Sequence, residues 1–318
     1  MRATLPRSQV ETWAGACLAL GNEVADADGF VSVRSLLHRF DASIVLRPLL
    51  VEAMLCASTD AANNPGANAA RWLLLVDSEK YTFPHEALDG ESSAVPLPAR
   101  FRNTVAHELT HSLAYRAKEF GVKLTLPTTS DKKKSSAVVD EIEQHTEKLS
   151  PLLLVSQRAI AQRFPSTLEW LTPDVLATAR RAWGVSRFVL IQRLNLMRGL
   201  EDRLAERRCF NNVAIGVGSW ARDGSAVLNG WPLFAKFANN EAPAFIHALV
   251  RAKSMAASTL TGDPSFVLNG GDVHALTMDV AAGTERSPEW SRLRIEFAVE
   301  RTQHKAGGMF FFVARALI

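Results

Sequence analysis

The chain has 318 residues, of which 47% are hydrophobic, and its formal net charge is +3. This length allows two domains, or one domain with appendages, and the apolar content can supply a sizeable core. The net charge is too small to indicate nucleic-acid or membrane binding by itself, and no apolar run is long enough to span a bilayer.

The cysteines and the N-terminal segment bear on the compartment of the protein. Cys17, Cys56 and Cys209 are far apart, and none belongs to a CxxC pair. This pattern favours neither a disulfide framework nor a thiolate zinc site. Gln9 and Glu11 interrupt the apolar stretch near the N-terminus, so a signal peptide is not predicted. We therefore expect a reduced, cytoplasmic protein without a membrane partner.

The N-terminal part of the chain predicts short helices followed by a strand. Residues 8–20 and 31–40 have the apolar spacing of amphipathic helices. Residues 58–70 are small, polar and rich in turn formers, which predicts a surface loop. The apolar run at 71–79 predicts a strand.

Two longer helices are predicted next. The first begins near residues 98–101 and runs to about residue 120, where Gly121 is a suitable C-terminal stop. Residues 125–137 are the most polar stretch of the chain, and we expect a mobile loop there. The second helix is predicted at about 138–164.

The first of these helices contains the segment RNTVAHELTHSLAYR. On a helix, residues four apart lie on one face, so His107 and His111 can share one metal ion. The apolar residues of the helix fall on another stripe, which predicts a helix packed on a core with its histidines lining a cleft. The alternative is an exposed helix that carries two histidines by chance.

A catalytic zinc ion usually takes three protein ligands and keeps a fourth position for water. The ion lowers the pKa of that water, and Glu108 would accept its proton as a general base. The second helix offers a third ligand, although its acids could instead form a solvated face. Spacing alone does not choose among its candidates, which are Asp140, Glu141, Glu143, His145 and Glu147.

The segments WLLLVDSEKY, RFRNTVAHELTH and EQHTEKLSPLLLVS together resemble the ImmA/IrrE family of zinc-dependent regulatory peptidases. In that family a short strand precedes the HExxH helix, and a later helix has the pattern E-x-x-A-N-x-F-A-x-x-L-L-x-P. The resemblance implies a zincin-like domain that binds zinc (Zn2+) through His107, His111 and Glu143, with Glu108 as the base. Glu141 is the second choice for the third ligand.

The chain departs from the family pattern at several positions. Thr110 stands at a usual Gly, Thr146 and Glu147 stand at the Ala-Asn pair, and Ser156 replaces a Pro. Glu147 lies one turn after Glu143, where it could orient a ligating histidine or repel the neighbouring carboxylate. The sequence does not identify the group that stabilises the oxyanion; the candidates are Tyr115, His145 and Arg102.

Residues 166–208 predict two helices joined by a tight turn, as in a helix-turn-helix. Thr172 and Ser186 are suitable N-caps, Pro173 suits a first helical position, and Gly184 allows the turn. We expect the core between the helices to contain Val185, Phe188, Ile191 and Leu194. The ImmA/IrrE family has a similar segment, which implies a scaffold role.

This segment is also rich in arginine. The arginines could contact DNA phosphates, but we favour a bundle packed on the peptidase domain, in which they pair with acidic neighbours. DNA binding stays the alternative. The residues concerned are Arg180, Arg181, Arg187, Arg193, Arg198, Arg203, Arg207 and Arg208.

Residues 209–318 have the pattern of a separate α+β domain. Residues 293–299 alternate apolar and polar side chains, residues 305–308 suit a turn, and residues 309–318 suit a buried returning strand. Further predicted elements are strands at 214–220 and 264–270 and a helix at 241–258. Some ImmA/IrrE members have a GAF-like sensor domain in this place, and this pattern is compatible with one.

The sequence therefore predicts an α+β protein with a zincin-like domain at 1–165, a helix-turn-helix-like segment at 166–208 and a sensor or docking domain at 209–318. The resemblance implies an endopeptidase that cleaves a helix-turn-helix repressor and so switches on a stress or mobile-element response. An extended substrate could add to the edge of the sheet that contains Trp72–Val76.

Two alternatives to this function stay open. One is a regulator with a structural or vestigial metal site, which binds DNA or a partner. The other is a peptidase with broad substrates. Manganese or iron in place of zinc is also open.

Overall fold

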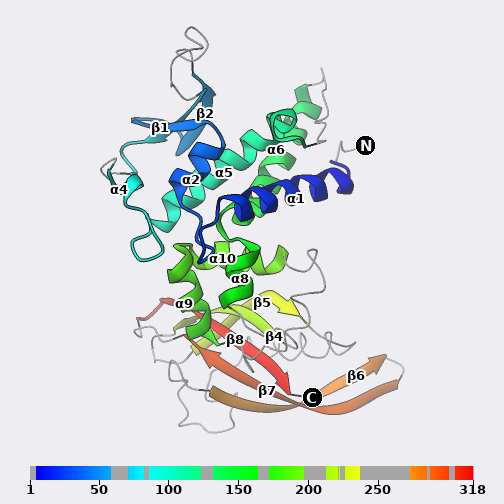
Figure 1. Ribbon diagram of the computed structural model, residues 1–318. Coiled ribbons are helices and arrows are strands. Elements are labelled where there is room, and N and C mark those ends of the chain that lie inside the picture. The colour runs from blue at the N-terminus through cyan, green and yellow to red at the C-terminus, as the bar shows by residue number, and fades with distance from the viewer. Residues whose placement is uncertain are drawn as a thin grey trace. The chain divides into compact units, whose positions relative to one another are not determined.

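The computed structural model describes residues 5–58, 71–81, 86–122, 132–163, 172–196, 213–220, 222, 226–236, 273–284, 287–300 and 305–317. The chain divides into two compact units, Met1–Arg163 with Arg180–Arg193 and Phe164–Ala179 with Leu194–Ile318. Helices are combined with one sheet of three strands and one of five (Figure 1). The predicted α+β class is confirmed, whereas the division into three parts at residues 165 and 208 stays a prediction.

The smaller sheet belongs to the first unit. Its strands are β1 (Ala42–Arg47), β2 (Ala53–Ala57) and β3 (Trp72–Asp77), in the order β1-β3-β2. β3, the strand predicted at 71–79, is central, with β1 parallel and β2 antiparallel to it. β2 is therefore an edge strand of this sheet.

Helices pack beside this sheet (Figure 1). They are α1 (Arg7–Val24), α2 (Val33–Arg39), α4 (Glu86–Asp89), α5 (Ala99–Tyr115), the 3-10 helix η1 (Ala117–Phe120), α6 (Lys132–Leu149), α7 (Pro151–Leu154) and α8 (Gln157–Arg163). α1 and α2 confirm the two helices expected at 8–20 and 31–40. α2 packs against β1, and α5 packs against β2, α6 and α7 and also contacts α1 and α2.

The core of the first unit forms along the apolar stripe of α5. Phe101, Val105, Leu109 and Leu113 are fully buried, as is Trp13 of α1. Burial of each large apolar side chain contributes roughly 2 kcal/mol before conformational entropy is subtracted. This stripe holds α5 in one orientation, so that its remaining face is directed away from the core.

The helices of this region end differently from the sequence prediction. α5 stops at Tyr115 and η1 follows it, with Gly121 in the left-handed conformation (φ 67°) as the predicted stop. The single helix expected at 138–164 is three helices, because Pro151 begins α7 and Val155 is extended and forms a bridge with Phe30. α6 begins at Lys132, so that 132–137 is helical rather than part of the expected loop.

The helix-turn-helix-like segment forms as predicted in its backbone. Its helices are α9 (Pro173–Trp183) and α10 (Arg187–Leu196), and the hydroxyl oxygens of Thr172 and Ser186 accept N-capping hydrogen bonds at 3.3 and 3.2 Å. Gly184 has φ 58°, and a Cβ there would lie 2.5 Å from a carbon of Pro96, so the turn requires glycine. Val185, Ile191 and Leu194 are buried as expected, but Phe188 is 57% exposed.

The second unit contains an antiparallel sheet with the order β5-β4-β8-β7-β6. Its strands are β4 (Val213–Trp220), β5 (Ala226–Lys236), β6 (Val273–Thr284), β7 (Ser287–Val299) and β8 (Met309–Leu317). β4, β7 and β8 confirm the strands predicted at 214–220, 293–299 and 309–318. The elements expected at 241–258 and 264–270, like the loop expected after Ser58, lie outside the described residues.

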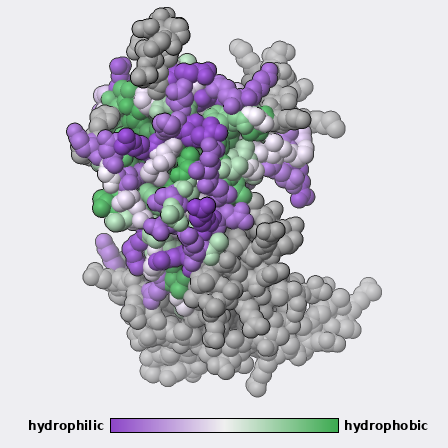
Figure 2. Space-filling view, in the orientation of Figure 1, coloured by the Kyte–Doolittle hydropathy of each residue, from purple (hydrophilic) through white to green (hydrophobic). Residues whose placement is uncertain are grey.

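The surface of the first unit is mostly polar. Hydrophilic residues cover most of its visible described part, with smaller hydrophobic patches between them (Figure 2). Leu50, Val51 and Met54 are among the exposed hydrophobic residues. Among the described helices, none combines the length and the apolar character that a membrane span requires.

Candidate metal centre

α5 and α6 bring together the three ligands that the resemblance implied. The Nε2 atom of His107 lies 2.9 Å from one carboxylate oxygen of Glu143, and Nε2 of His111 lies 2.7 Å from the other. One ligand atom from each residue lies within 4.8 Å of the other two. The two histidines are about one-fifth exposed and Glu143 is 49% exposed, so solvent reaches the group.

This group fits a zinc ion by its donor chemistry. Two imidazole nitrogens and one carboxylate oxygen are the protein ligands of one class of catalytic zinc site, in which a fourth position stays open for water or substrate. The close approach of the donor atoms lets one ion reach all of them. Burial and the nearby His107 lower the pKa of His111, while Glu143 opposes this shift. The neutral imidazole, which is the form that binds metal, is thereby favoured.

Thr146 of α6 is a member of the site that the sequence prediction missed. Its side chain is fully buried, and its Oγ1 lies 3.3 Å from Nδ1 of His111. Glu147, the residue considered for this orienting role in the sequence, is exposed. The signal in the sequence was the spacing, because Thr146 lies one helical turn after Glu143 and therefore on the same face.

Glu108 lies between this group and the edge strand β2. Burial and, to a smaller extent, the charge of Glu143 raise the pKa of its carboxyl to about 7, against the opposing effect of a hydrogen bond from the Leu55 backbone. The pairing register explains that hydrogen bond. At the two ends of β2, the N–H of Asp77 donates to the Glu52 carbonyl and the N–H of Ser58 donates to the Arg71 carbonyl. Hydrogen-bonded positions alternate along an antiparallel ladder, so Met54 and Cys56 between these ends also bond to β3. The N–H of Leu55 therefore points out of the sheet edge.

The remaining candidates lie elsewhere or have other partners. Glu141 accepts a hydrogen bond from the Leu5 backbone at 2.9 Å and lies 3.8 Å from His145, so neither is brought into the group. Burial, more than the nearby Lys148, lowers the pKa of His145. Tyr115 is 63% exposed, one turn beyond His111 on α5.

Arg102 is fully buried, on the core side of α5. It pairs with Glu91, donates to the carbonyl oxygens of Val31 and Trp183 at 2.7 and 3.2 Å, and stacks on the Phe30 ring at 4.5 Å. These contacts join α5 to its surroundings and leave Arg102 away from the cleft.

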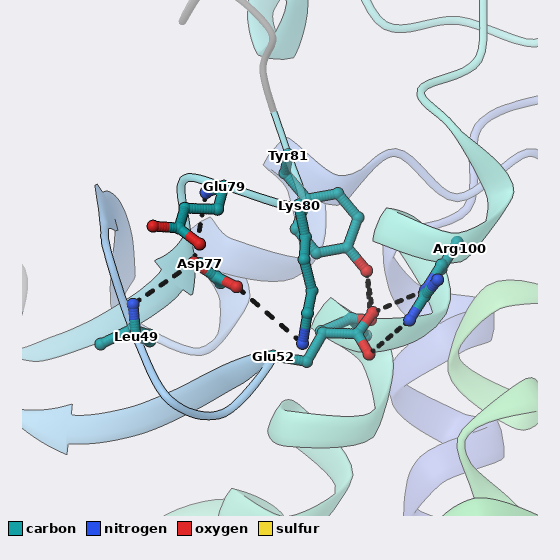
Figure 3. Close-up of polar contacts among 8 residues, drawn as sticks. Leu49, Glu52, Asp77, Glu79, Lys80, Tyr81 and Arg100 are labelled. Carbon is teal, nitrogen blue, oxygen red and sulfur yellow. Dashed lines mark hydrogen bonds and ion pairs between the residues drawn. The ribbon is translucent and has the colours of Figure 1, made fainter.

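A second polar cluster extends the same face of α5 by one turn (Figure 3). The carboxylate of Glu52 accepts hydrogen bonds from Arg100 at 2.9 and 3.1 Å, from Thr104 at 3.0 Å and from the hydroxyl of Tyr81. The Arg100 hydrogen bonds in particular lower the pKa of Glu52 to about 2. Burial, followed by the hydrogen bond to Glu52, raises the pKa of Tyr81 to about 12. No pattern in the sequence indicated this cluster, because its members meet only through the fold.

No protein-family model matches the chain, and no curated protein matches it significantly. The resemblance to the ImmA/IrrE family therefore depends on the quoted motifs alone and stays a prediction.

Proposed function

We propose that the chain is a cytoplasmic zinc endopeptidase. The observation that supports this function best is the convergence of His107, His111 and Glu143, with Glu108 beside them and in contact with the edge strand β2. His107, His111 and Glu143 would hold the zinc ion, which would supply a water molecule of lowered pKa and Lewis-acid polarisation of the scissile carbonyl. Glu108 is placed to accept the proton of the attacking water at its carboxylate and to deliver it to the leaving amine.

The exposed edge of β2 is a second observation in favour of a peptide as the substrate. The backbone groups of Ala53, Leu55 and Ala57 point away from β3, by the register described above. An extended segment of a substrate can hydrogen-bond to the backbone groups of Ala53 and Ala57 and to the Leu55 carbonyl as an added strand, because the Leu55 N–H already contacts Glu108. Because Leu55 contacts Glu108, a segment bound there lies beside the catalytic carboxylate.

The class of substrate follows from the resemblance. It implies a DNA-binding repressor of the helix-turn-helix type, whose cleavage switches on a stress response or the genes of a mobile element. The second unit is then a sensor or docking domain, GAF-like by the same resemblance. Direct DNA binding is less favoured, because Arg193 is fully buried and so cannot contact a phosphate from there. Arg198, Arg203, Arg207 and Arg208 lie outside the described residues.

The function is tested by replacing the base without touching the ligands. Wild type and Glu108→Gln are expressed in the native host, and new protein N-termini are compared by mass spectrometry. We expect a fragment of one repressor in the presence of wild type, its loss in Glu108→Gln, and one zinc ion per chain in both. Glu147→Gln is the matched control, because it changes an exposed acid of α6 and should keep full activity.

The outcomes separate the alternatives. Cleavage of many unrelated proteins would favour a broad peptidase. Identical N-termini in wild type and Glu108→Gln, with and without stress, would favour a regulator with a structural metal site.

A further inference from the structure

We propose that Thr146 is a positioning residue, which fixes the orientation of the His111 ring for metal binding. This inference depends on the proposed metal site. It concerns a contact of the protein itself, so that it can be tested on the metal-free chain as well.

The first step is the hydrogen-bond chemistry. A neutral imidazole carries one N–H and one lone pair, and the nitrogen that binds a metal must offer the lone pair. In His111 the Nε2 atom is directed toward Glu143, and Nδ1 is directed toward Thr146 Oγ1 at 3.3 Å. Without a metal, Nε2–H donates to the Glu143 carboxylate, and the Thr146 hydroxyl donates to Nδ1. When a metal takes the place of the Nε2 proton, Nδ1 carries the proton instead and the same hydroxyl oxygen can accept it. Hydrogen bonds of this kind set the orientation and basicity of metal-bound histidines.

The second step is the burial of Thr146. Its side chain is 0% exposed, and Leu149 at the end of α6 and Ser150, which follows that helix, are also buried. A buried hydroxyl is shielded from water, so that its hydrogen bond competes with few alternatives. Thr146 also lies one turn after Glu143, and a single face of α6 therefore supplies one ligand and supports another.

The third step is the difference between the two histidines. Among the described residues, a hydrogen bond to Nδ1 is found at His111 and not at His107. The imidazole of His107 is thus positioned by its place on α5 and by Glu143, whereas that of His111 has an additional fixed contact. Loss of Thr146 should therefore affect His111 selectively.

The test compares two substitutions of similar size. Thr146→Val keeps the shape and removes the hydroxyl, whereas Thr146→Ser keeps the hydroxyl. Thr110→Val is the control, because Thr110 is also fully buried but donates to the Ala106 carbonyl at 2.7 Å on the core side of α5. Zinc affinity is measured by competition with a chelating indicator. We expect a loss of about 10- to 100-fold in Thr146→Val, and wild-type affinity in Thr146→Ser and Thr110→Val.

A second readout needs no metal. The 15N chemical shifts of the imidazoles in the metal-free chain report which ring nitrogen carries the proton. We expect His111 to carry its proton on Nε2, which faces Glu143, and Nδ1 to show the shift of a hydrogen-bonded nitrogen in wild type and Thr146→Ser. In Thr146→Val the Nδ1 shift should move to that of a nitrogen without a hydrogen bond, with His107 unchanged. Equal zinc affinity and unchanged His111 shifts in Thr146→Val would overturn the inference. A wild-type chain that binds no zinc would instead overturn the proposed function, while the 15N shift of Nδ1 would still decide the role of Thr146.

Discussion

The buried ion pair between Arg102 and Glu91 offers the strictest test of how the first unit is held together. Both side chains are 0% exposed, and burial lowers the pKa of Arg102 while the charge of Glu91 opposes that shift. Replacement of Arg102 by Met keeps most of the volume but leaves the Glu91 carboxylate buried without its cation. Removal of one partner of a buried pair typically costs about 3–5 kcal/mol.

Other contacts of Arg102 add to this cost. Its guanidinium donates to the carbonyls of Val31 and Trp183 and stacks on Phe30. Since these contacts are partly replaced by water after the substitution, we take about 4 kcal/mol as the expected loss in the free energy of unfolding. This is a large fraction of the 5–15 kcal/mol that is typical of a whole domain.

Urea denaturation measures this loss, and a double-mutant cycle shows how much of it comes from the interaction between Arg102 and Glu91. Glu91→Gln removes the charge but keeps an acceptor for the Val33 backbone N–H. We expect Arg102→Met together with Glu91→Gln to lose at least about 1 kcal/mol less than the sum of the two single changes, because no unpaired charge then stays buried. Arg100→Met, which removes an arginine that is 72% exposed, should have a much smaller effect.

Two results would refute this reasoning. One is a loss below about 1 kcal/mol in Arg102→Met, since that would mean that the carboxylate is readily solvated. The other is a variant that unfolds like wild type but no longer cleaves its substrate. That result would return Arg102 to the role of oxyanion stabiliser, which its burial argues against.

Three further predictions concern titratable side chains. Burial lowers the pKa of Arg193 from 12.5 to about 10, and two of its nitrogens find no hydrogen-bond partner among the described residues. Arg193→Met removes this buried charge but also the hydrogen bond to the Val155 carbonyl, which is worth about 1 kcal/mol. The net effect should be an increase of about 2 kcal/mol in the free energy of unfolding, measured by urea titration. The pKa of Glu52 is lowered from 4.5 to about 2, so its contribution to stability is present above about pH 4.5 and is lost as the pH falls toward 2. Glu52→Gln should therefore lower the free energy of unfolding at pH 7, flatten its pH dependence between about pH 4.5 and 2, and leave it close to wild type near pH 2. Burial raises the pKa of the Cys17 thiol to about 12, whereas Cys56 is partly exposed; iodoacetamide should therefore label Cys56 and leave Cys17 unmodified in the native protein, as peptide mapping can show.

The parts of the site that the sequence predicted are those fixed by helix geometry. His107 and His111 lie on one face of α5 because of their spacing. The apolar stripe on the other side of the helix packs into the core, so the face with the histidines points away from the core. Glu143 could not be predicted in this way, because it lies on α6 and its distance from the histidines of α5 depends on how the two helices pack. Spacing left five candidates in that helix, and only the family resemblance selected Glu143.

The missed elements share a physical cause, which is that tertiary contacts override local pattern. The strand β5 contains Gly230 and Pro232, which argue against a strand in the sequence. The sheet accommodates them because β5 is at its edge and the pairing register shifts between Ile215 and Val217, opposite this stretch. The long helix expected at 138–164 failed for a related reason, since the bridge between Val155 and Phe30 requires extended backbone there.

The two polar groups along α5, the metal centre and the cluster around Glu52, also differ in whether the sequence could predict them. The centre formed with Glu143 has a sequence signature, because metal ligation demands particular residue types at particular spacings. The cluster around Glu52 has none, because hydroxyl and guanidinium donors from any element can satisfy a carboxylate. Both lie on one face of the helix, next to the edge strand on which we expect the substrate to bind. If the chain is the proposed peptidase and selects its substrate by charge, the selection should therefore depend on Arg100 and Glu52 rather than on the metal ligands.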